Sequence, residues 1–576
     1  MEVVDWIVLA FTLVSIVVYG MWKTRKATAD TYISGGNDSK WLTIGLSVMA
    51  TQASAITFLS VPGQAYDDGM RFIQIYFGLP IALIIVSAVI IPIYYRLKVV
   101  TAYEYLESRF DLKTRMFTAA LFLIQRGLAA GITIYAPAII LTSIIGIPLT
   151  PTIFIVGILV IIYTVSGGTK AVSITQKWQM TVIMAGMGVA FGILMKYIGE
   201  HVSFGEAVTL AGAMEKMNMV DLSLDFNERY TIWSGVTGGV FLALSYFGTD
   251  QSQVQRYLTG KSLTESRLGL MFNALLKIPM QFFILFVGIM MFVFYQFIMP
   301  PVHFNQPAIE ALEGDQKIEL NKLQEQHRVN FEEKKSTAIH FLDAHNSGDE
   351  IAAEQYKVNL NSLYQEQREI SSEVKRVIAS TDENKLISKT EKELKDTDYI
   401  FISFIIDYLP AGIVGLLIAV IFSAAMSSTA GELNALSATL TVDFYKRVVK
   451  KDGSSEHYRA ATRWFVILFG GLAIGFAVFA RLVENLIEAV NILGSIFYGP
   501  ILGIFLVAFF MKFIRARAIF FAGLLTQTIV IISYAIHELG FLWYNAIGSV
   551  LVVVLAIILQ QVLPNGNKPK LEKSDL

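Results

Sequence analysis

The chain contains repeated apolar stretches, each about as long as a bilayer is thick. Crossing the ~30 Å hydrocarbon core takes roughly 20 apolar residues in a helix, and a helix satisfies its own backbone groups there. The repeats predict an all-α polytopic membrane protein with about 13 transmembrane helices. The expected spans are 4–22, 41–60, 78–97, 116–144, 150–167, 177–198, 232–248, 268–297, 405–430, 463–482, 487–511, 518–536 and 541–562.

Composition agrees with lipid as the main surroundings. Of 576 residues, 54% are hydrophobic and only 16% are charged, whereas a soluble protein of this size needs more charge on its surface. The lack of cysteine excludes thiolate metal sites and disulfides. A net charge of −1 gives no indication of nucleic-acid binding. The stretch 4–22 lacks a basic leader and a cleavage site, so we expect it to be retained as a span.

Basic residues in the short connections predict the orientation, because cytoplasmic loops are enriched in Lys and Arg. Alternate connections carry basic clusters, for example Arg96 with Lys98 and Arg515 with Arg517, and the intervening connections carry few. We therefore expect a protein of the plasma (inner) membrane, with the N-terminus outside and the C-terminus in the cytoplasm.

One long polar segment, about 305–398, separates the eighth and ninth expected spans on the outer side. Its second half carries apolar residues at heptad spacing, including Leu360, Leu363 and Val374, which predicts a helical hairpin. Ser347 and Glu350 have the spacing of a capping box at the turn. The hairpin could provide contact with an extracytoplasmic protein partner, or it could pack only on itself.

Two spans contain residues that interrupt helices. Pro62-Gly63 follows a run of small and polar residues in the second span, and Gly235, Gly238 and Gly239 lie in the seventh. Broken helices at matching positions of two halves are typical of inverted-repeat transporters with a binding site at the membrane midplane. Glycine is also common in membrane helices simply because it allows close packing.

An apolar stretch at 422–447 carries an unusual number of oxygen-bearing side chains. A sodium ion inside a membrane needs about five or six hard oxygen ligands, and unwound backbone in a broken helix frees carbonyl groups for that purpose. Ser427, Ser428 and the carbonyl of Ala424 could supply such ligands. Alternatively, the hydroxyl groups only bond the carbonyl one turn earlier in their own helix.

Five motifs resemble the sodium/solute symporter family, which includes transporters of sugars, iodide, vitamins, monocarboxylates and sialic acid. They occur in the family's order over roughly 1–300 and 400–510, and they are closest to the non-sugar branch that carries anions, monocarboxylates or iodide. The motifs are "SVMATQASAITFL", "IYAPAIILTSIIG", "YTVSGGTKAVSITQKWQ", "LALSYFGTDQSQVQRYL" and "FSAAMSSTAGELNALSATLTVDFYKR".

The resemblance implies a leucine-transporter-type core of two inverted five-helix repeats with additional flanking spans. The expected units are an N-terminal span and loop at 1–40, a first repeat at 41–198, the start of the second repeat at 199–304, the hairpin at 305–398, the rest of the second repeat at 399–511, and two further spans with a cytoplasmic tail at 512–576.

The resemblance also implies a sodium site between the first and eighth core helices. Its ligands would be backbone oxygens of the first helix, and an alanine carbonyl with two hydroxyl groups on the eighth. The matching positions in this chain are Ala50, Ala53, Ala424, Ser427 and Ser428.

Some members of the family have a second sodium site, from which this chain departs. Gln176 stands at the position of the aspartate, and Ala430 and Gly431 stand at the hydroxyl positions. A neutral amide cannot neutralise an ion, so we expect one sodium per cycle. Glu432 could return the lost carboxylate, or it could pair with a nearby cation or reach an aqueous vestibule.

Alternating access would rock one helix bundle against another around Ser54–Phe58 and Thr237–Tyr246. Several candidate solute residues lie in these segments. Thr57, Tyr76, Leu79 and Ala243 stand where sugar transporters hold hydroxyl groups, and most of them cannot do so, whereas Tyr246 and Lys277 match a gate tyrosine and a lysine of those transporters.

Arg126 lies deep in a span and could clamp a carboxylate, or it could pair with Glu432, Asp250 or another carboxylate. Asp250 and Gln251 are expected at a cytoplasmic gate, and Gln176 and Glu432 are further candidates for gating or coupling. The candidate solute ligands are Ser54, Thr57, Phe58, Tyr76, Arg126, Tyr246 and Lys277.

Together these features predict a sodium symporter that imports a small organic solute, such as a carboxylate or an acidic sugar, by alternating access. Its expected partners are Na+ as the coupling ion, the solute and the lipid bilayer. No cofactor and no enzymatic activity are expected. The alternatives are a proton-coupled carrier in which Glu432 titrates and a transporter-like membrane sensor.

Overall fold

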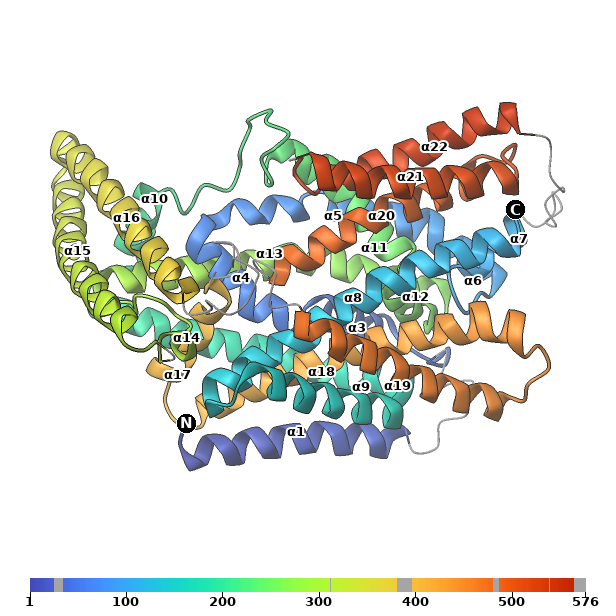
Figure 1. Cartoon of the computed structure of the whole chain (residues 1–576), viewed down its shortest axis with the longest axis horizontal. Helices are drawn as coiled ribbons and strands as arrows, with labels where there is room; N and C mark the ends of the chain where they lie inside the picture. Colours follow the sequence, from blue (N-terminus) through green and yellow to red (C-terminus); the bar gives the residue numbers. More distant parts are fainter. Residues whose placement is uncertain (25–34, 311, 381–395, 480–485, 538, 564–576) are drawn as a thin grey trace.

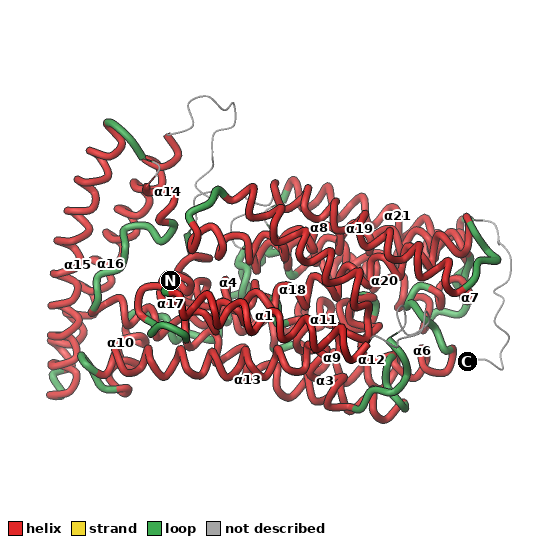
Figure 2. Tube along the Cα trace, turned by 90° about the horizontal axis from the view of Figure 1, so that it is seen from below, coloured by secondary structure: helices red, strands yellow, loops and turns green. Residues whose placement is uncertain are grey.

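The computed structural model describes residues 1–24, 35–310, 312–380, 396–479, 486–537 and 539–563. Across these ranges the secondary structure is helical, apart from one isolated bridge between Ser39 and Gly260. The long helices run side by side along the long axis of the molecule (Figures 1 and 2). The all-α prediction is therefore confirmed.

The helices of the main bundle are α1 (Val3–Thr24), α3 (Trp41–Gln52), α4 (Ala55–Asp68), α5 (Leu79–Ile85), α6 (Ile91–Leu97), α8 (Leu112–Ile145), α9 (Leu149–Gly199), α11 (Gly239–Gly248), α13 (Leu263–Phe297), α18 (Ile413–Thr439), α19 (Ser455–Phe479), α20 (Leu486–Phe510), α21 (Ala516–Ile536) and α22 (Trp543–Val562). Shorter helices at the ends of the bundle are α7 (Glu104–Arg109), α10 (Phe204–Ala213), α12 (Gln251–Leu258), α14 (Gln306–Glu310) and α17 (Ile400–Tyr408).

Within the described residues, 10 helical segments are long and apolar enough to cross a membrane, and 2 shorter apolar helices lie at 3–16 and 234–248. The segment at 55–97 contains parts of two expected spans. Most residues of the thirteen expected spans are helical, but 41–60 is interrupted at residues 53–54, and 405–430 crosses the non-helical residues 409–412 between α17 and α18. Residues 480–482 lie outside the described ranges.

The expected spans 150–167 and 177–198 belong to one helical element, α9. Twelve residues of straight helix would separate Tyr163 from Thr175 by ~18 Å, yet their hydroxyl groups are 2.8 Å apart. Between these two residues α9 therefore bends back on itself.

The interruption in the second span lies at Ala53 and Ser54. Ala53 has φ −85° and ψ 66°, and Ser54 has φ −71° and ψ 173°, so α3 ends and α4 begins there. The second span is thus interrupted as expected, at the first residue of the run of small and polar residues; Pro62-Gly63 does not interrupt it, because α4 continues through Pro62 to Asp68.

The seventh span is interrupted at a different place from the one expected. Its glycines lie in and next to a π-helical turn at 234–238, and the non-helical residues are Thr249 and Asp250, between α11 and α12. A Cβ on Gly235 would lie 2.3 Å from the carbonyl oxygen of Gln74. Gly235 therefore allows close packing, as the alternative explanation expected.

The helix α18 lies in the middle of the bundle. It packs against α1, α8, α9 and α19, and also against both α3 and α4. The N-terminal end of α18 is held by Asp5 of α1, whose Oδ1 accepts hydrogen bonds from the amides of Gly412 at 2.6 Å and Gly415 at 3.0 Å. These amides begin α18, so a carboxylate caps the positive end of its dipole.

The polar segment forms a hairpin of α15 (Asp315–Ser347) and α16 (Glu350–Ala379), at the same end of the bundle as the N-terminus (Figure 1). The heptad prediction is confirmed, because Leu360, Leu363 and Val374 are buried. The prediction of a capping box at Ser347 and Glu350 is wrong. Gly348 has φ +77° at the turn, and Asp349 caps α16 by accepting a hydrogen bond from the amide of Ala352.

The hairpin rests on the end of α4. Lys216 donates hydrogen bonds to the carbonyl of Asp67 and, at 3.0 Å, to the hydroxyl of Tyr364 on α16. A cavity of about 550 Å³ lies below the hairpin, between residues 66–68 of α4 and the α16 side chains Tyr364, Arg368 and Lys375. We call it the outer cavity.

Candidate functional site

A second cavity, the central cavity, has a volume of about 140 Å³ and lies between α4, α8, α11, α13, α18 and α20. Six of the seven predicted solute ligands line it, together with the predicted coupling residue Glu432. These residues are Ser54, Thr57, Tyr76, Arg126, Tyr246, Lys277 and Glu432. The non-helical residues at the start of α4 bring Ser54 and Thr57 into the wall, and the rest come from helices far apart in the sequence.

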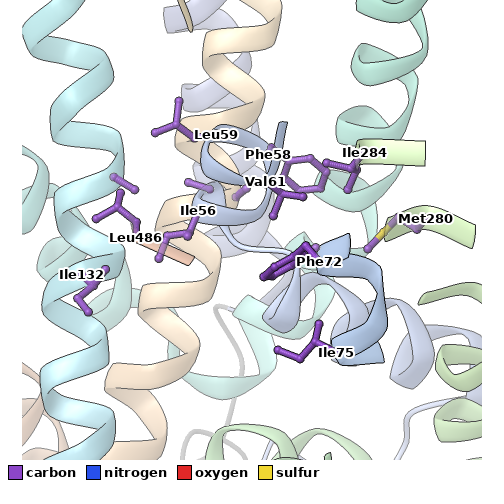
Figure 3. Close-up of a cluster of buried hydrophobic side chains, with 14 of the residues drawn as sticks. Ile56, Phe58, Leu59, Val61, Phe72, Ile75, Ile132, Met280, Ile284 and Leu486 are labelled. Carbon is purple, nitrogen blue, oxygen red and sulfur yellow. The ribbon is translucent and has the colours of Figure 1, made fainter. Parts of the chain in front are cut away.

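Phe58 does not line the central cavity. Its side chain is 1% exposed and lies among apolar residues, next to Val61 and near Ile284 (Figure 3). One residue on from Thr57, it points about 100° away around α4. Phe58 therefore contributes to the apolar core.

Lys277 brings a positive charge to the cavity wall from α13. It is 3% exposed, and its Nζ lies 5.5 Å from the centre of the Tyr76 ring. Among the residues that the structure describes, Lys277 has no ion pair, although a buried ammonium group normally requires one. This leaves a cation that faces the cavity without a carboxylate of its own.

Arg126 is paired with both of the carboxylates that the sequence offered as alternatives. Its Nη1 lies 3.1 Å from Oε1 of Glu432, and its Nη2 contacts Oδ2 of Asp250 and the hydroxyl of Tyr498. Tyr498 also donates to Oδ2 of Asp250 at 2.8 Å, and Thr133 donates to Oε2 of Glu432 at 2.8 Å. The guanidinium therefore connects α8, α12, α18 and α20 through hydrogen-bonded charges.

Sequence analysis did not identify Thr133 and Tyr498 as site residues. Tyr498 lies in an apolar helix, α20, and nothing local distinguishes it from a packing tyrosine. Arg126 offered an indirect signal for both residues. A buried guanidinium group and the carboxylates paired with it need several hydrogen-bond partners, so hydroxyl-bearing side chains were to be expected around them.

Gln251 has a different role from that of Asp250. Its side chain bonds the backbone of the connection after α6, accepting from the amide of Ala102 at 3.0 Å and donating to the carbonyl of Val100 at 2.9 Å. Asp250 caps α12 by accepting from the amide of Ser252 at 2.8 Å. Both residues therefore fix the C-terminal end of α11 and the start of α12.

The predicted sodium ligands are all buried, at 0–3% exposure, on α3, at the α3–α4 break and on α18, and α18 packs against both α3 and α4; they are Ala50, Ala53, Ala424, Ser427 and Ser428. Ser428 donates to the carbonyl of Ala424 at 3.1 Å, as the alternative explanation expected. Its oxygen still has lone pairs. The Oγ of Ser427 is buried and has no hydrogen-bond partner among the described residues, so its lone pairs are available to coordinate a cation.

The position of the second sodium site contains a different arrangement. Gln176 accepts from Ser47 at 2.6 Å and donates to Thr51 at 3.1 Å, both on α3. Nη2 of Arg256 lies 2.7 Å from the point that a Cβ on Gly431 would occupy. The guanidinium of Arg256, which is 1% exposed, therefore fills the space next to Gly431.

Long apolar helices, a helix broken beside a buried polar cavity, and charges inside the bundle together define a membrane transporter. Comparison with known families makes the class specific. The model of the Sodium:solute symporter family matches residues 32–314 and 384–526, so the chain belongs to this family of sodium-coupled transporters.

Two relatives illustrate the range of the family. The chain is 32% identical to the human sodium/iodide cotransporter over 295 residues, which is 50% of this chain and 45% of the cotransporter. It is 25% identical to the sodium/sialic acid symporter SiaT of Proteus mirabilis (strain HI4320) over 590 residues, covering 99% and 98% of the two chains. The chain thus spans less than half of the iodide cotransporter's length.

A solved structure has the same fold. It is that of a substrate-bound, outward-open, Na+-coupled sialic acid symporter, with a TM-score of 0.74 and 24% identity over 98% of this chain and 99% of the other. The leucine-transporter-type fold expected from the sequence is confirmed.

Proposed function

We propose that this protein is a sodium-coupled symporter for a small organic anion. The observation that carries the choice of solute is Lys277, a buried cation in the wall of the central cavity without an ion pair among the described residues. An anionic group of the solute would supply that pair, and the charge-assisted hydrogen bond would be strong in this environment. Arg126 is less suited to this role, because Asp250 and Glu432 already neutralise it.

The size of the central cavity supports a small solute. Its volume of about 140 Å³ is close to that of an engineered cavity of ~150 Å³ that accommodates benzene. Its apolar wall includes Ile56, Leu242 and Val490. A short-chain carboxylate, with its charge at Lys277 and its carbon chain on this wall, matches both features. An acidic sugar would need the cavity to expand.

We further propose that the carbonyl oxygens of Ala50, Ala53 and Ala424 and the hydroxyl oxygens of Ser427 and Ser428 bind the coupling sodium. Two features support this. The backbone leaves the helical conformation at Ala53, which frees carbonyl groups nearby, and Ser427 has a buried oxygen without a partner.

The proposal includes one sodium per cycle. Arg256 supports this number, because its guanidinium lies next to Gly431, where a second ion would have to bind. Two unit charges ~4 Å apart repel by ~4 kcal/mol at an effective dielectric constant of ~20. Symport of one sodium with one monovalent anion moves no net charge, so the ~2.3 kcal/mol that sodium alone would gain from ~100 mV does not contribute. A tenfold sodium gradient supplies ~1.4 kcal/mol, which could concentrate the anion about tenfold.

Alternating access would use the two breaks in the bundle. The residues Ala53 and Ser54 divide α3 from α4, and Thr249 and Asp250 divide α11 from α12. Both breaks lie beside the central cavity or its ion pairs, so rotation about them would open the cavity to one side and close it to the other. Sodium at the first break would stabilise one of the two states.

Uptake into liposomes tests the function. Purified protein should accumulate a radiolabelled short-chain monocarboxylate when sodium is imposed outside at fixed pH, and it should not do so in potassium. A neutral hexose and a halide serve as controls for the solute. A proton gradient imposed without sodium tests the alternative of a proton-coupled carrier that uses Glu432. Uptake driven by protons alone would contradict sodium symport, and no carboxylate uptake with strong hexose uptake would contradict the choice of solute.

A further inference from the structure

The hairpin contains a groove of about 400 Å³ between α15 and α16, apart from the outer cavity. Five glutamates and no basic residue line it. The lining residues are Glu325, Gln326, Val329, Asn330 and Glu333 on α15, and Glu366, Glu369, Ile370 and Glu373 on α16. The groove is therefore strongly acidic.

The side of the hairpin that faces the transporter is different. Tyr364, Arg368 and Lys375 line the outer cavity, whereas Glu366, Glu369 and Glu373 line the groove. At 100° per residue, these two sets lie on opposite sides of α16. The groove consequently faces away from the bundle.

Asn330 supplies a second, independent sign that the groove binds a ligand. Its side chain is 4% exposed, and its Nδ2 donates to the carbonyl of Leu363 and to Oε2 of Glu366, both at 3.1 Å. Its Oδ1 is buried and accepts no hydrogen bond from the residues that the structure describes. An unsatisfied buried acceptor costs ~1–3 kcal/mol, so this oxygen calls for an N–H donor from outside the hairpin.

The groove also has an apolar surface. Val329 is 54% exposed among the five carboxylates, and Ile370, which is buried, also lines the groove. Lysine and arginine combine N–H donors and a positive charge with an alkyl chain that packs on apolar surface. One such side chain would satisfy Asn330, the glutamates and Val329 together.

The carboxylates are not arranged for a metal ion. Within the described part of the chain, no three His, Asp or Glu residues lie close enough to hold one. Glu325 is paired with Arg328 at 2.6 Å, and no ion pair is found for Glu333, Glu369 or Glu373 among the described residues. These three charges are open to a partner.

We propose that this groove docks a lysine- or arginine-bearing segment of another protein on the hairpin side of the membrane. The α15 positions 325–333 span ~12 Å along the helix, which is room for two or three basic side chains. The hairpin is thus an interaction surface for a basic partner, in addition to being packed on itself.

Binding of a defined peptide to the full-length protein tests this proposal. The protein would be placed in nanodiscs of phosphatidylcholine, which has no net charge. The probe is a soluble dodecapeptide with three lysines and one leucine among serine and glycine residues, and its control carries glutamate in place of lysine. We expect saturable binding of the lysine peptide alone, weakened by salt because exposed charges are screened.

Matched variants separate the groove from general attraction to acidic surface. Glu369→Gln with Glu373→Gln should weaken peptide binding at least tenfold, whereas Glu319→Gln with Glu332→Gln removes the same charge outside the groove and should change it less than twofold. Val329→Ser should weaken binding even at high salt. Circular dichroism checks that each variant keeps its helices.

Three results would overturn the proposal. The first is equal loss of binding in both glutamate pairs. The second is no saturable binding up to 1 mM peptide. The third is calcium binding that the groove pair abolishes while peptide binding is unchanged, which would assign the groove to a cation instead.

Discussion

The unpartnered hydroxyl of Ser427 gives the sharpest test of the sodium site. In Ser427→Ala the buried oxygen disappears, and with it a cost of ~1–3 kcal/mol that is not recovered by any hydrogen bond. Without sodium, the free energy of unfolding should therefore stay the same or rise by about 1–2 kcal/mol. Most buried Ser→Ala changes remove a hydrogen bond and have the opposite effect.

With sodium the same change should be harmful. A ligand at 100 times its Kd stabilises the folded state by ~2.7 kcal/mol. If loss of one of five oxygens weakens sodium binding about tenfold, the stabilisation by sodium (the sodium increment) at that concentration falls by ~1.4 kcal/mol, to about half. The assay is unfolding of the detergent-purified full chain in sodium compared with choline, over a range of concentrations.

Ser423 provides a matched control on the same helix. It lies one turn earlier on α18, is 2% exposed, and its Oγ is also buried without a partner. Ser423→Ala should give the sodium-free effect and keep the full sodium increment. The site assignment is refuted if Ser427→Ala retains the increment, or if both variants lose it equally.

Three further predictions concern the charged residues. Lys277→Met should weaken carboxylate binding about 10- to 100-fold, since a hydrogen bond to a charged group contributes ~1.5–3 kcal/mol. The stabilisation of the protein by sodium should be kept. Unchanged carboxylate affinity in a binding assay would exclude Lys277 as the anchor. Arg126→Met should destabilise the protein by ~3–5 kcal/mol, because it leaves buried charges unpaired. Adding Glu432→Gln should restore part of the lost stability in a thermal melt. No rescue would mean that the two residues are not coupled. Burial lowers the pKa of Lys334, in the hairpin, to about 7. Between pH 7 and ~10.5 the folded state therefore binds fewer protons than the unfolded state. The free energy of unfolding consequently rises with pH in this range, by at most ~1.4 kcal/mol per pH unit from this group. Lys334→Met should therefore stabilise the hairpin more at pH 6 than at pH 9 in proteolysis, and an equal gain at both would argue against that pKa.

Much of the fold could be predicted from the sequence because lipid imposes a simple rule on it. Apolar length locates spans, and the heptad stripe that includes Leu360 and Val374 located the second helix of the hairpin. The breaks were harder to locate. Pro62 attracted attention, but a proline can be accommodated within a membrane helix, whereas the non-helical residues Ala53 and Ser54 carry no local signal.

The candidate site could be predicted only in part, for a similar reason. Arg126 was identified as a buried charge that needs a partner, and both proposed carboxylates, Asp250 and Glu432, were among its possible partners. Tyr498 was missed because its role depends on how distant helices meet. Phe58 was predicted as a solute ligand because it lies in the same motif as Ser54 and Thr57. Its side chain leaves α4 in another direction and does not line the central cavity.

The helix α4 connects two places that ligands could reach independently. It has 14 residues and is ~21 Å long, with one end at the break beside Ser54 and the other beneath the hairpin at Asp67. A small molecule bound in the outer cavity would restrict the movement of α4 without competing with the solute for the central cavity. Inhibitors designed for that cavity would be expected to lower the maximal velocity of uptake while leaving the half-saturating solute concentration nearly unchanged.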